Sequence, residues 1–484
     1  MLFCQTLSHS RQLRYFGSID LKMDLLRNCL ASCILAFCLT AANVHAVVNF
    51  TNLVYFNGPN GANPSAGLVR ATDGNFYGTT SSGGATNLGT VFQLTASGTL
   101  NTLISFAMTN GASPLTELVQ GADSKLYGTT YGGGTYTFGT VFSVTTSGVL
   151  TNLVSFDGYT NGLPKGSLVR GTDGWFYGTT AIGGTNSLLG TAFRISTNGV
   201  LQQVCSFGAD GASPYAGMVQ GADGYLYGTT FSGGTYGHGT VFKLATNGTL
   251  LTLHPFAGGS DGDSPYAPLV QATDGNFYGT TQYGGTNAYG TVFRVSSSGA
   301  FSTLASFANT NGAHPQAGLI EGTDGCLYGM TAEGGVFTNQ ITTGCGTIFK
   351  VATNGVLTSL FSFDGTNGAS PRAGLLQVSY GTFCGTTYGS GLKGSSVTYG
   401  TIFRITISAP PRPIFQSITR AGNSLVLTWS TVPGAQYQLE SIGDLSQTNW
   451  SNSGSLLTAD GAFLSATNSI GPAQRQFYRV LLRQ

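Results

Sequence analysis

The sequence has few charged residues, and this shortage excludes some broad classes of protein. Charged residues make up 8% of the 484 residues, and the formal net charge is +1. Typical globular chains carry about 25% charged residues. Nucleic-acid binding through a basic surface is not expected, because phosphate is attracted by clustered Lys and Arg. The 11% of aromatic residues and the low net charge also exclude a disordered polyelectrolyte.

Motifs for catalysis and for metal binding are also missing from the sequence. It has five histidines and neither an HExxH nor a Gly-x-Ser-x-Gly motif. No two cysteines have the CxxC spacing of a thiolate zinc site, and no Asp-x-Asp-x-Asp run suits calcium. We therefore expect no metal, no cofactor and no enzymatic activity.

Long apolar runs are missing except near the N-terminus. Basic residues precede an apolar run from Cys29 to Ala42, and small residues lead up to Ala46. The run is shorter than the ~20 residues that span a bilayer, and the pattern is typical of a secretory leader. The sequence predicts a signal peptide over residues 1–46, cleaved after Ala46. The mature chain is then secreted, periplasmic or on the cell surface, without a transmembrane segment.

Glycine, in contrast, is abundant at 73 residues, about twice its usual share, and it recurs at a fixed spacing. Tyr-Gly-Thr-Thr or a near copy begins at Tyr77, Tyr127, Tyr177, Tyr227, Tyr278, Tyr328 and Cys384. Gly-Thr-x-Phe begins at Gly89, Gly139, Gly190, Gly239, Gly290, Gly346 and Gly400. The chain therefore contains seven copies of one unit of about 50 residues, which is the signature of a repeat architecture.

Each copy predicts four short strands separated by turn signals. In the first copy these strands are residues 68–70, 76–80, 90–94 and 100–106. Asp73-Gly74 fits a two-residue hairpin in which both residues take positive φ. Val91 and Phe92 are both apolar, so the third strand is expected to be covered on both faces. Four-stranded units buried on both faces and repeated seven times predict an all-β, seven-bladed β-propeller.

The chain ends predict how the ring closes. The seventh copy stops after its third strand, whereas residues 52–56 before the first copy resemble an extra fourth strand. We expect this N-terminal strand to complete the seventh blade, which leaves no open sheet edge. The propeller then spans residues 47–408.

The repeated block resembles a known family. Asp-Gly-x-x-Tyr-Gly-Thr-Thr-x-x-Gly-Gly followed by Gly-Thr-Val-Phe is similar to the tandem repeat called GloVer, found in secreted bacterial proteins. The resemblance covers about residues 47–406. It implies a secreted or surface β-protein, and it brings neither an established activity nor catalytic residues.

A different module follows the repeats. Residues 409–413 form a stiff proline-rich linker. Residues 414–484 contain Trp429 and Tyr437 in strand-like runs and resemble a fibronectin type III β-sandwich. Such modules act as spacers or adhesion units.

The four cysteines after the predicted cleavage site are Cys205, Cys326, Cys345 and Cys384. They do not recur at equivalent repeat positions, so they are not the framework of the fold. An oxidising compartment allows three pairings, and the spacing does not choose among them.

Candidate binding residues belong to the loops that differ between copies, because residues repeated in every copy serve the repeat itself. These loops carry many aromatic rings, which suit sugar faces or partner side chains; the alternative is local packing over the blade tops. The principal candidates are Tyr131, Tyr136, Phe231, Tyr236, His238, Tyr283 and Tyr289. The same set includes Tyr159, Tyr215, Tyr266, Phe337, Tyr388 and Tyr399.

A second candidate set lies on the first strand of each copy. If this strand is innermost, its polar residues crowd toward a central channel, where Arg70, Arg170 and Glu321 could hold an anionic or sugar ligand. The alternative is contact with channel water.

The sequence therefore predicts a secreted, non-catalytic recognition scaffold for extracellular glycan or surface protein, acting through its aromatic loop face. A structural role in the cell envelope is the first alternative. A carbohydrate-active enzyme, either a glycosidase or a polysaccharide lyase, is the second, since some propellers carry such activities and fold alone does not decide.

Overall fold

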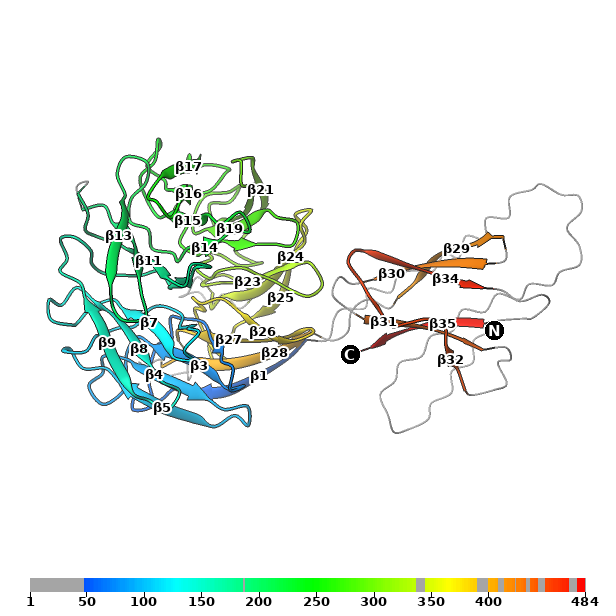
Figure 1. The fold of residues 1–484 in the computed structure, drawn as a ribbon, viewed down its shortest axis with the longest axis horizontal. Helices are drawn as coiled ribbons and strands as arrows, with labels where there is room; N and C mark the ends of the chain where they lie inside the picture. The colour runs from blue at the N-terminus through cyan, green and yellow to red at the C-terminus, as the bar shows by residue number, and fades with distance from the viewer. Residues whose placement is uncertain are drawn as a thin grey trace, which may run out of the picture. The chain divides into compact units, whose positions relative to one another are not determined.

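A computed structural model describes residues 48–483 apart from short gaps. The gaps are residues 186–187, 337–343, 390–398, 408–412, 423, 432–435, 443–448 and 470–476. The predicted signal peptide, linker residues 409–412 and Phe337 therefore lie outside the described residues. Every regular element that the structure describes is a β-strand, and Val48–Ile407 forms one compact unit (Figure 1).

The first blade is a four-stranded antiparallel sheet in chain order. Its strands are β2 (Val69–Arg70), β3 (Phe76–Thr80), β4 (Thr90–Leu94) and β5 (Leu100–Ser105). The turn before β3 differs from the predicted two-residue hairpin. Only Gly74 has a positive φ, of 83°, and Ala71 pairs with Asn75 across three residues. Asp73 accepts from the Asn75 N–H at 3.0 Å and from the Tyr77 hydroxyl at 2.6 Å, so it anchors a buried tyrosine.

Five further blades repeat this sheet in the same order. The second and third contain β6 (Val119–Gln120), β7 (Leu126–Thr130), β8 (Thr140–Val144), β9 (Leu150–Ser155), β10 (Val169–Arg170), β11 (Phe176–Thr180), β12 (Thr191–Ile195) and β13 (Leu201–Ser206). The fourth and fifth contain β14 (Val219–Gln220), β15 (Leu226–Thr230), β16 (Thr240–Leu244), β17 (Leu250–Pro255), β18 (Val270–Gln271), β19 (Phe277–Thr281), β20 (Thr291–Val295) and β21 (Phe301–Ser306). The sixth contains β22 (Ile320–Glu321), β23 (Leu327–Thr331), β24 (Thr347–Val351) and β25 (Leu357–Ser362).

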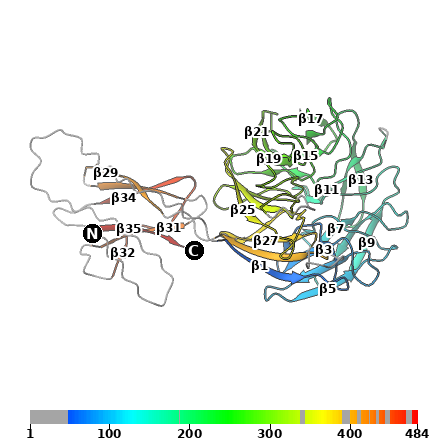
Figure 2. The same ribbon diagram turned by 180° about the vertical axis from the view of Figure 1, so that it is seen from behind.

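The seventh blade takes its outer strand from the N-terminus. Its sheet order is β26 (Leu376–Ser379), β27 (Thr382–Thr387), β28 (Thr401–Ile407) and β1 (Val48–Tyr55). Strand β1 pairs antiparallel with β28 from Val48↔Ile407 to Tyr55↔Thr401, and both views show the two strands side by side (Figures 1 and 2). The predicted closure of a seven-bladed propeller by the N-terminal strand is confirmed.

Apolar side chains at equivalent positions fill the seams between neighbouring blades. Tyr77, Val91 and Phe106 of the first blade pack with Leu126 and Phe142 of the second. The Phe106 and Phe142 rings meet edge to face at 5.2 Å. The seam between the seventh and first blades is packed in the same way. Burying one such side chain contributes about 1.5–3 kcal/mol to stability, so packing in all seven seams stabilises the closed ring.

A backbone contact recurs in every seam. In the second blade the Ser113 N–H donates to the Leu88 carbonyl of the first blade at 2.8 Å, and the Ser113 carbonyl accepts from the Tyr131 N–H at 3.1 Å. The equivalent residues make the same two hydrogen bonds, and all have φ between 50° and 56°. We call these the latch residues: Asn63, Ser113, Leu163, Ser213, Ser264, His314 and Ser370. Left-handed backbone costs a residue with a Cβ about 1–2 kcal/mol, and the two hydrogen bonds offset that cost.

The latch explains two invariant residues of the repeat. A proline follows each latch residue, and a Cβ on Gly89 would lie 2.6 Å from Cδ of Pro114 and 2.4 Å from the Thr80 carbonyl oxygen. The first residue of Gly-Thr-x-Phe is therefore glycine, because a side chain there would overlap the proline of the next blade and the preceding strand of its own blade.

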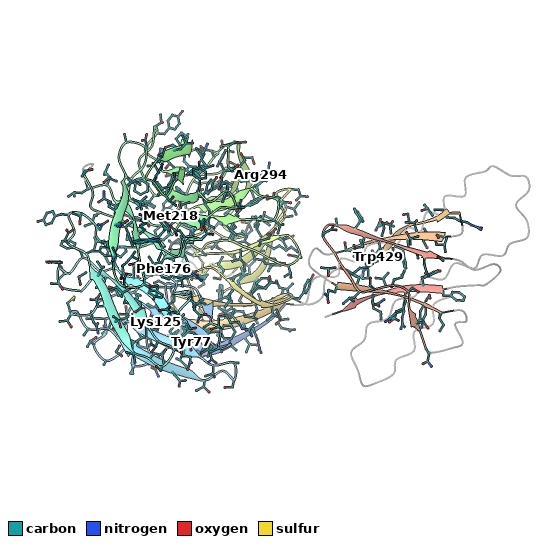
Figure 3. All side chains as sticks on the ribbon, viewed as in Figure 1. Tyr77, Lys125, Phe176, Met218, Arg294 and Trp429 are labelled. Carbon is teal, nitrogen blue, oxygen red and sulfur yellow. The ribbon has the colours of Figure 1, made fainter. Side chains whose placement is uncertain are left out.

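The C-terminal unit is a small β-sandwich of two sheets. One sheet contains β29 (Phe415–Ala421), β30 (Ser424–Ser430) and β34 (Phe463–Ser469), and the other contains β31 (Gln436–Ile442), β32 (Ser451–Asn452), β33 (Leu457–Thr458) and β35 (Phe477–Arg483). Trp429 and Tyr437 are fully buried, and Figure 3 shows Trp429 between the sheets. The Arg479 guanidinium donates to the Glu440 carboxylate at 2.5 Å. Assignment of this unit to the fibronectin type III class stays a prediction.

The structure also places the four cysteines. Cys205, Cys326, Cys345 and Cys384 are unpaired thiols on three different blades. Burial raises the pKa of Cys205 and of Cys384 to about 11, so neither is a ready nucleophile.

The part of the chain that the structure describes contains no helix that could span a membrane.

Replacing Gly89 with Ala tests the latch. We expect the free energy of unfolding to fall by more than about 3 kcal/mol, because the new Cβ would overlap the Thr80 carbonyl and Pro114. Gly98→Ala is the matched control: its φ of 92° is similar, but its Cβ meets nothing within 4 Å, so we expect about 1–2 kcal/mol. Equal losses in chemical denaturation would show that the seam contact is unimportant.

Candidate functional site

The strand order sorts the connections of the propeller onto two faces. The Asp-Gly and Ser-Gly hairpin turns lie on one face, which we call the turn face. The loops from second to third strand and the segments between blades lie on the other, the loop face. The first strand of each blade is innermost and the fourth is outermost (Figure 1). Segments entering the first strands therefore surround the propeller axis on the loop face.

The residue after each latch proline differs from blade to blade. In chain order these residues are Ser65, Leu115, Lys165, Tyr215, Tyr266, Gln316 and Arg372. The proline packs against the glycine of the seam, whereas the residue after it makes no backbone hydrogen bond between blades in the described part of the chain and varies. Beside this ring lie the residues that follow Tyr-Gly-Thr-Thr, which include Tyr131, Phe231 and Tyr388.

Aromatic and cationic side chains from these two positions contact one another in two sets. Lys165 Nζ lies 3.7 Å from the centroid of the Tyr215 ring and 5.6 Å from that of Tyr131. The Tyr215 ring stacks on Phe231 at 4.9 Å and meets Tyr266 edge-on at 5.8 Å. The Arg372 guanidinium lies 3.9 Å from the centroid of the Tyr388 ring. We call the two sets together the axial cluster: Tyr131, Lys165, Tyr215, Phe231 and Tyr266 in one set, and Arg372 and Tyr388 in the other.

Electrostatic contacts link the cluster across blades that are not neighbours. Burial raises the pKa of the Tyr266 hydroxyl, and the positive charge of Arg372, two blades away, acts in the opposite direction. Tyr215 and Tyr131 raise it further. Such contacts between distant blades arise only near the axis, so the members face a common region.

One carboxyl lies deeper along the axis, and the sequence analysis missed it. Glu117 occupies the position at which four other blades have glycine. A Cβ on Gly67 would lie 1.8 Å from its Oε1, and one on Gly374 would lie 3.6 Å from it. Burial raises the pKa of Glu117 from 4.5 to about 7, and a hydrogen bond from the Gly67 backbone opposes that shift. A carboxylate at a glycine position of the repeat was the available signal.

The seven principal candidates from the loops divide into three places. Tyr131 and Phe231 belong to the axial cluster. Tyr136 and Tyr236 stand at loop tips with 56% and 59% of their surface exposed. The remaining three line seams between blades: His238 pairs with Asp263 at 3.1 Å, and Tyr283 and Tyr289 contact His314.

The polar residues of the first strands bridge neighbouring blades on the turn face. Glu321 accepts from the Thr273 N–H at 2.9 Å and from the Thr273 hydroxyl at 2.7 Å. Glutamines at the equivalent positions accept in the same way from the preceding blade: Gln120, Gln220, Gln271 and Gln377. Arg70 and Arg170 are exposed. The structure does not bring these three candidates together with the axial cluster.

The described residues contain no group of three His, Cys, Asp or Glu side chains able to hold a metal ion. Shallow hollows occur in the outer seams, at repeat-equivalent positions around Ser105 and Ser206. Neither hollow contains a member of the axial cluster.

Replacing Glu117 with Gln tests the buried carboxyl. A folded-state pKa raised from 4.5 to about 7 means that the folded chain binds the proton more tightly. Stability is therefore lost as pH rises from about 4.5 to 7, by at most about 3 kcal/mol. We expect the variant to be more stable than the parent at pH 8 and to lose that advantage at pH 4.5. A pH-independent difference in melting temperature would contradict this.

The chain is similar to two solved structures at low sequence identity. A putative 6-phosphogluconolactonase from Bacteroides uniformis is 18% identical, with a TM-score of 0.42, over 61% of this chain and 84% of that one. The PQQ-bound aldose sugar dehydrogenase from Streptomyces coelicolor is 13% identical, with a TM-score of 0.38, over 75% and 99%. No curated protein matches the chain.

A family comparison is more extensive. The model of the Gloeobacter/Verrucomicrobia repeat matches residues 37–219 and 204–403. These two matches together cover the seven copies almost completely and include the latch and the axial cluster. The chain belongs to the Gloeobacter/Verrucomicrobia repeat family, the family that its repeated block resembles.

Proposed function

We propose that the protein is a secreted, non-catalytic recognition scaffold that binds an extracellular glycan or surface protein through its loop face. The axial cluster is the observation that supports this proposal. It gathers five aromatic rings and two cations at positions that differ from blade to blade. Aromatic rings give apolar area with a polar edge, which suits sugar faces and partner side chains.

Different residues maintain the repeat fold and form the proposed binding surface. Residues that recur along the repeat make hydrogen bonds that the fold needs, such as the bond from the Tyr77 hydroxyl to Asp73 at 2.6 Å, which has a counterpart in each of the first six blades. The axial cluster lies beyond them, so its residues can change while the seams stay intact. Rings that already pack against one another, as Tyr215 does against Phe231, lose little conformational entropy on binding.

The loop tips extend the proposed surface. Tyr136 and Tyr236 are exposed and stand outside the axial cluster, so they suit the outer units of a longer ligand. Cleavage after Ala46 would leave strand β1, which begins at Val48, available to close the ring. This agrees with secretion of a chain that folds after the leader is removed.

Glycan-array binding by the mature chain, residues 47–484, is the first test, with the supernatants checked for released sugars. Binding without release supports recognition, whereas release would show a carbohydrate-active enzyme. If no glycan binds and the protein self-associates, the structural alternative is favoured.

The double variant Tyr215→Ala/Tyr266→Ala tests the place of binding. We expect the dissociation constant of any bound glycan to rise at least about tenfold, because two contacting rings are removed from the centre of the site. The matched control Tyr136→Ala/Tyr236→Ala removes two rings from the tips and should change it less than about fivefold. Titration of both variants with the glycan measures the two dissociation constants, and melting curves verify that both variants fold. If the loop-tip variant weakens binding more than Tyr215→Ala/Tyr266→Ala does, the binding site lies at the loop tips.

A further inference from the structure

We propose that the axial cluster is a binding site for an acidic saccharide, in which aromatic rings hold sugar faces while Lys165 and Arg372 pair with the carboxylate. This inference rests on the proposed recognition function and names the chemical class of its ligand. It is carried by the placement and the pairing of the two cations.

Lysines of the propeller that face the turn side have acidic partners. Lys243 pairs with Asp223 at 2.9 Å, and Lys350 pairs with Asp324 at 2.5 Å. In each case the aspartate is the recurring residue of the Asp-Gly turn. Lysine charge on that face is therefore neutralised within the repeat.

The two cations of the axial cluster are held differently. Among the described residues neither Lys165 nor Arg372 forms an ion pair. Like Lys243, which lies 4.0 Å from the centroid of the Tyr225 ring, each lies against an aromatic ring, Lys165 on Tyr215 and Arg372 on Tyr388. A cation on a ring face keeps most of its donors available. The rings fix its position without cancelling its charge, which favours binding of an anion.

The positions of the cations fit a ligand larger than a simple ion. Lys165 and Arg372 come from the third and seventh blades, and the rings of Tyr215 and Tyr266 come from the blades between them. A ligand that reaches a cation therefore also meets the aromatic rings around it. An arginine pairs with a planar carboxylate through two parallel hydrogen bonds, and a sugar ring stacks on tyrosine. A uronic acid carries both features in one unit.

Glu117 reduces the positive charge of this region but does not cancel it. Its carboxyl accepts from the Gly67 backbone, and burial raises its pKa to about 7. Even when fully ionised it carries one negative charge, against the two positive charges of Lys165 and Arg372. The net charge at the axis remains positive.

Isothermal titration with tetragalacturonate and with its fully methyl-esterified form tests this inference, because esterification removes the charge and keeps the sugar. We expect the acid to bind and the ester to bind at least about tenfold more weakly. Lys165→Met and Arg372→Met, which keep a long side chain on the rings, should each weaken binding of the acid at least about tenfold. Lys125→Met on the turn face is the control for net charge and should change nothing.

Other outcomes separate this inference from the proposed function. Binding of neutral glycans that is lost in Tyr215→Ala/Tyr266→Ala but kept in both cation variants would overturn the acidic ligand and leave recognition standing. Inorganic phosphate that binds as tightly as tetragalacturonate would also overturn it, because the sugar would then add nothing. Failure of tetragalacturonate and of a hyaluronan tetrasaccharide to bind would overturn it as well, whatever the array shows for other ligands.

Discussion

The propeller depends on one backbone contact that occurs in all seven seams. Each latch residue holds a left-handed conformation so that its N–H reaches the preceding blade while its carbonyl accepts from its own blade. Two blades are thereby fixed to each other independently of side-chain identity at that position, which is Asn, Ser, Leu or His. The contact dictates the proline that follows and the glycine that packs beneath it.

A seam defined by backbone leaves other positions free to vary. The residue after each latch proline has no part in the hydrogen bonds between blades, and it ranges from Ser65 to Arg372. By contrast, the buried threonines that share a hydrogen bond, such as Thr80 and Thr90 at 2.7 Å, recur in every blade. The fold thus concentrates variation on the loop face, in the segments that enter the innermost strands.

The chain has few charged residues, and those that recur in the repeat have a structural role. Most aspartates of the Asp-Gly turns bind tyrosine hydroxyls, and several also hold a lysine. The recurring Asp therefore has a structural explanation. Lys165, Arg372 and Glu117 stand apart from this scheme, since none of the three lies at a position where the repeat calls for charge.

The sequence by itself determined the repeat count, the four strands of each blade and closure by the N-terminal strand, because glycine, turn and strand signals are local and recur seven times. It also pointed to variable aromatic loops. Only the tertiary structure decided which of those aromatics meet: Tyr131 and Tyr215 converge on Lys165, whereas Tyr136 and Tyr289 lie elsewhere. It likewise assigned Glu321 to a bridge between blades. Convergence at an axis joins residues from several repeats, and no local pattern in one repeat encodes the distance to another.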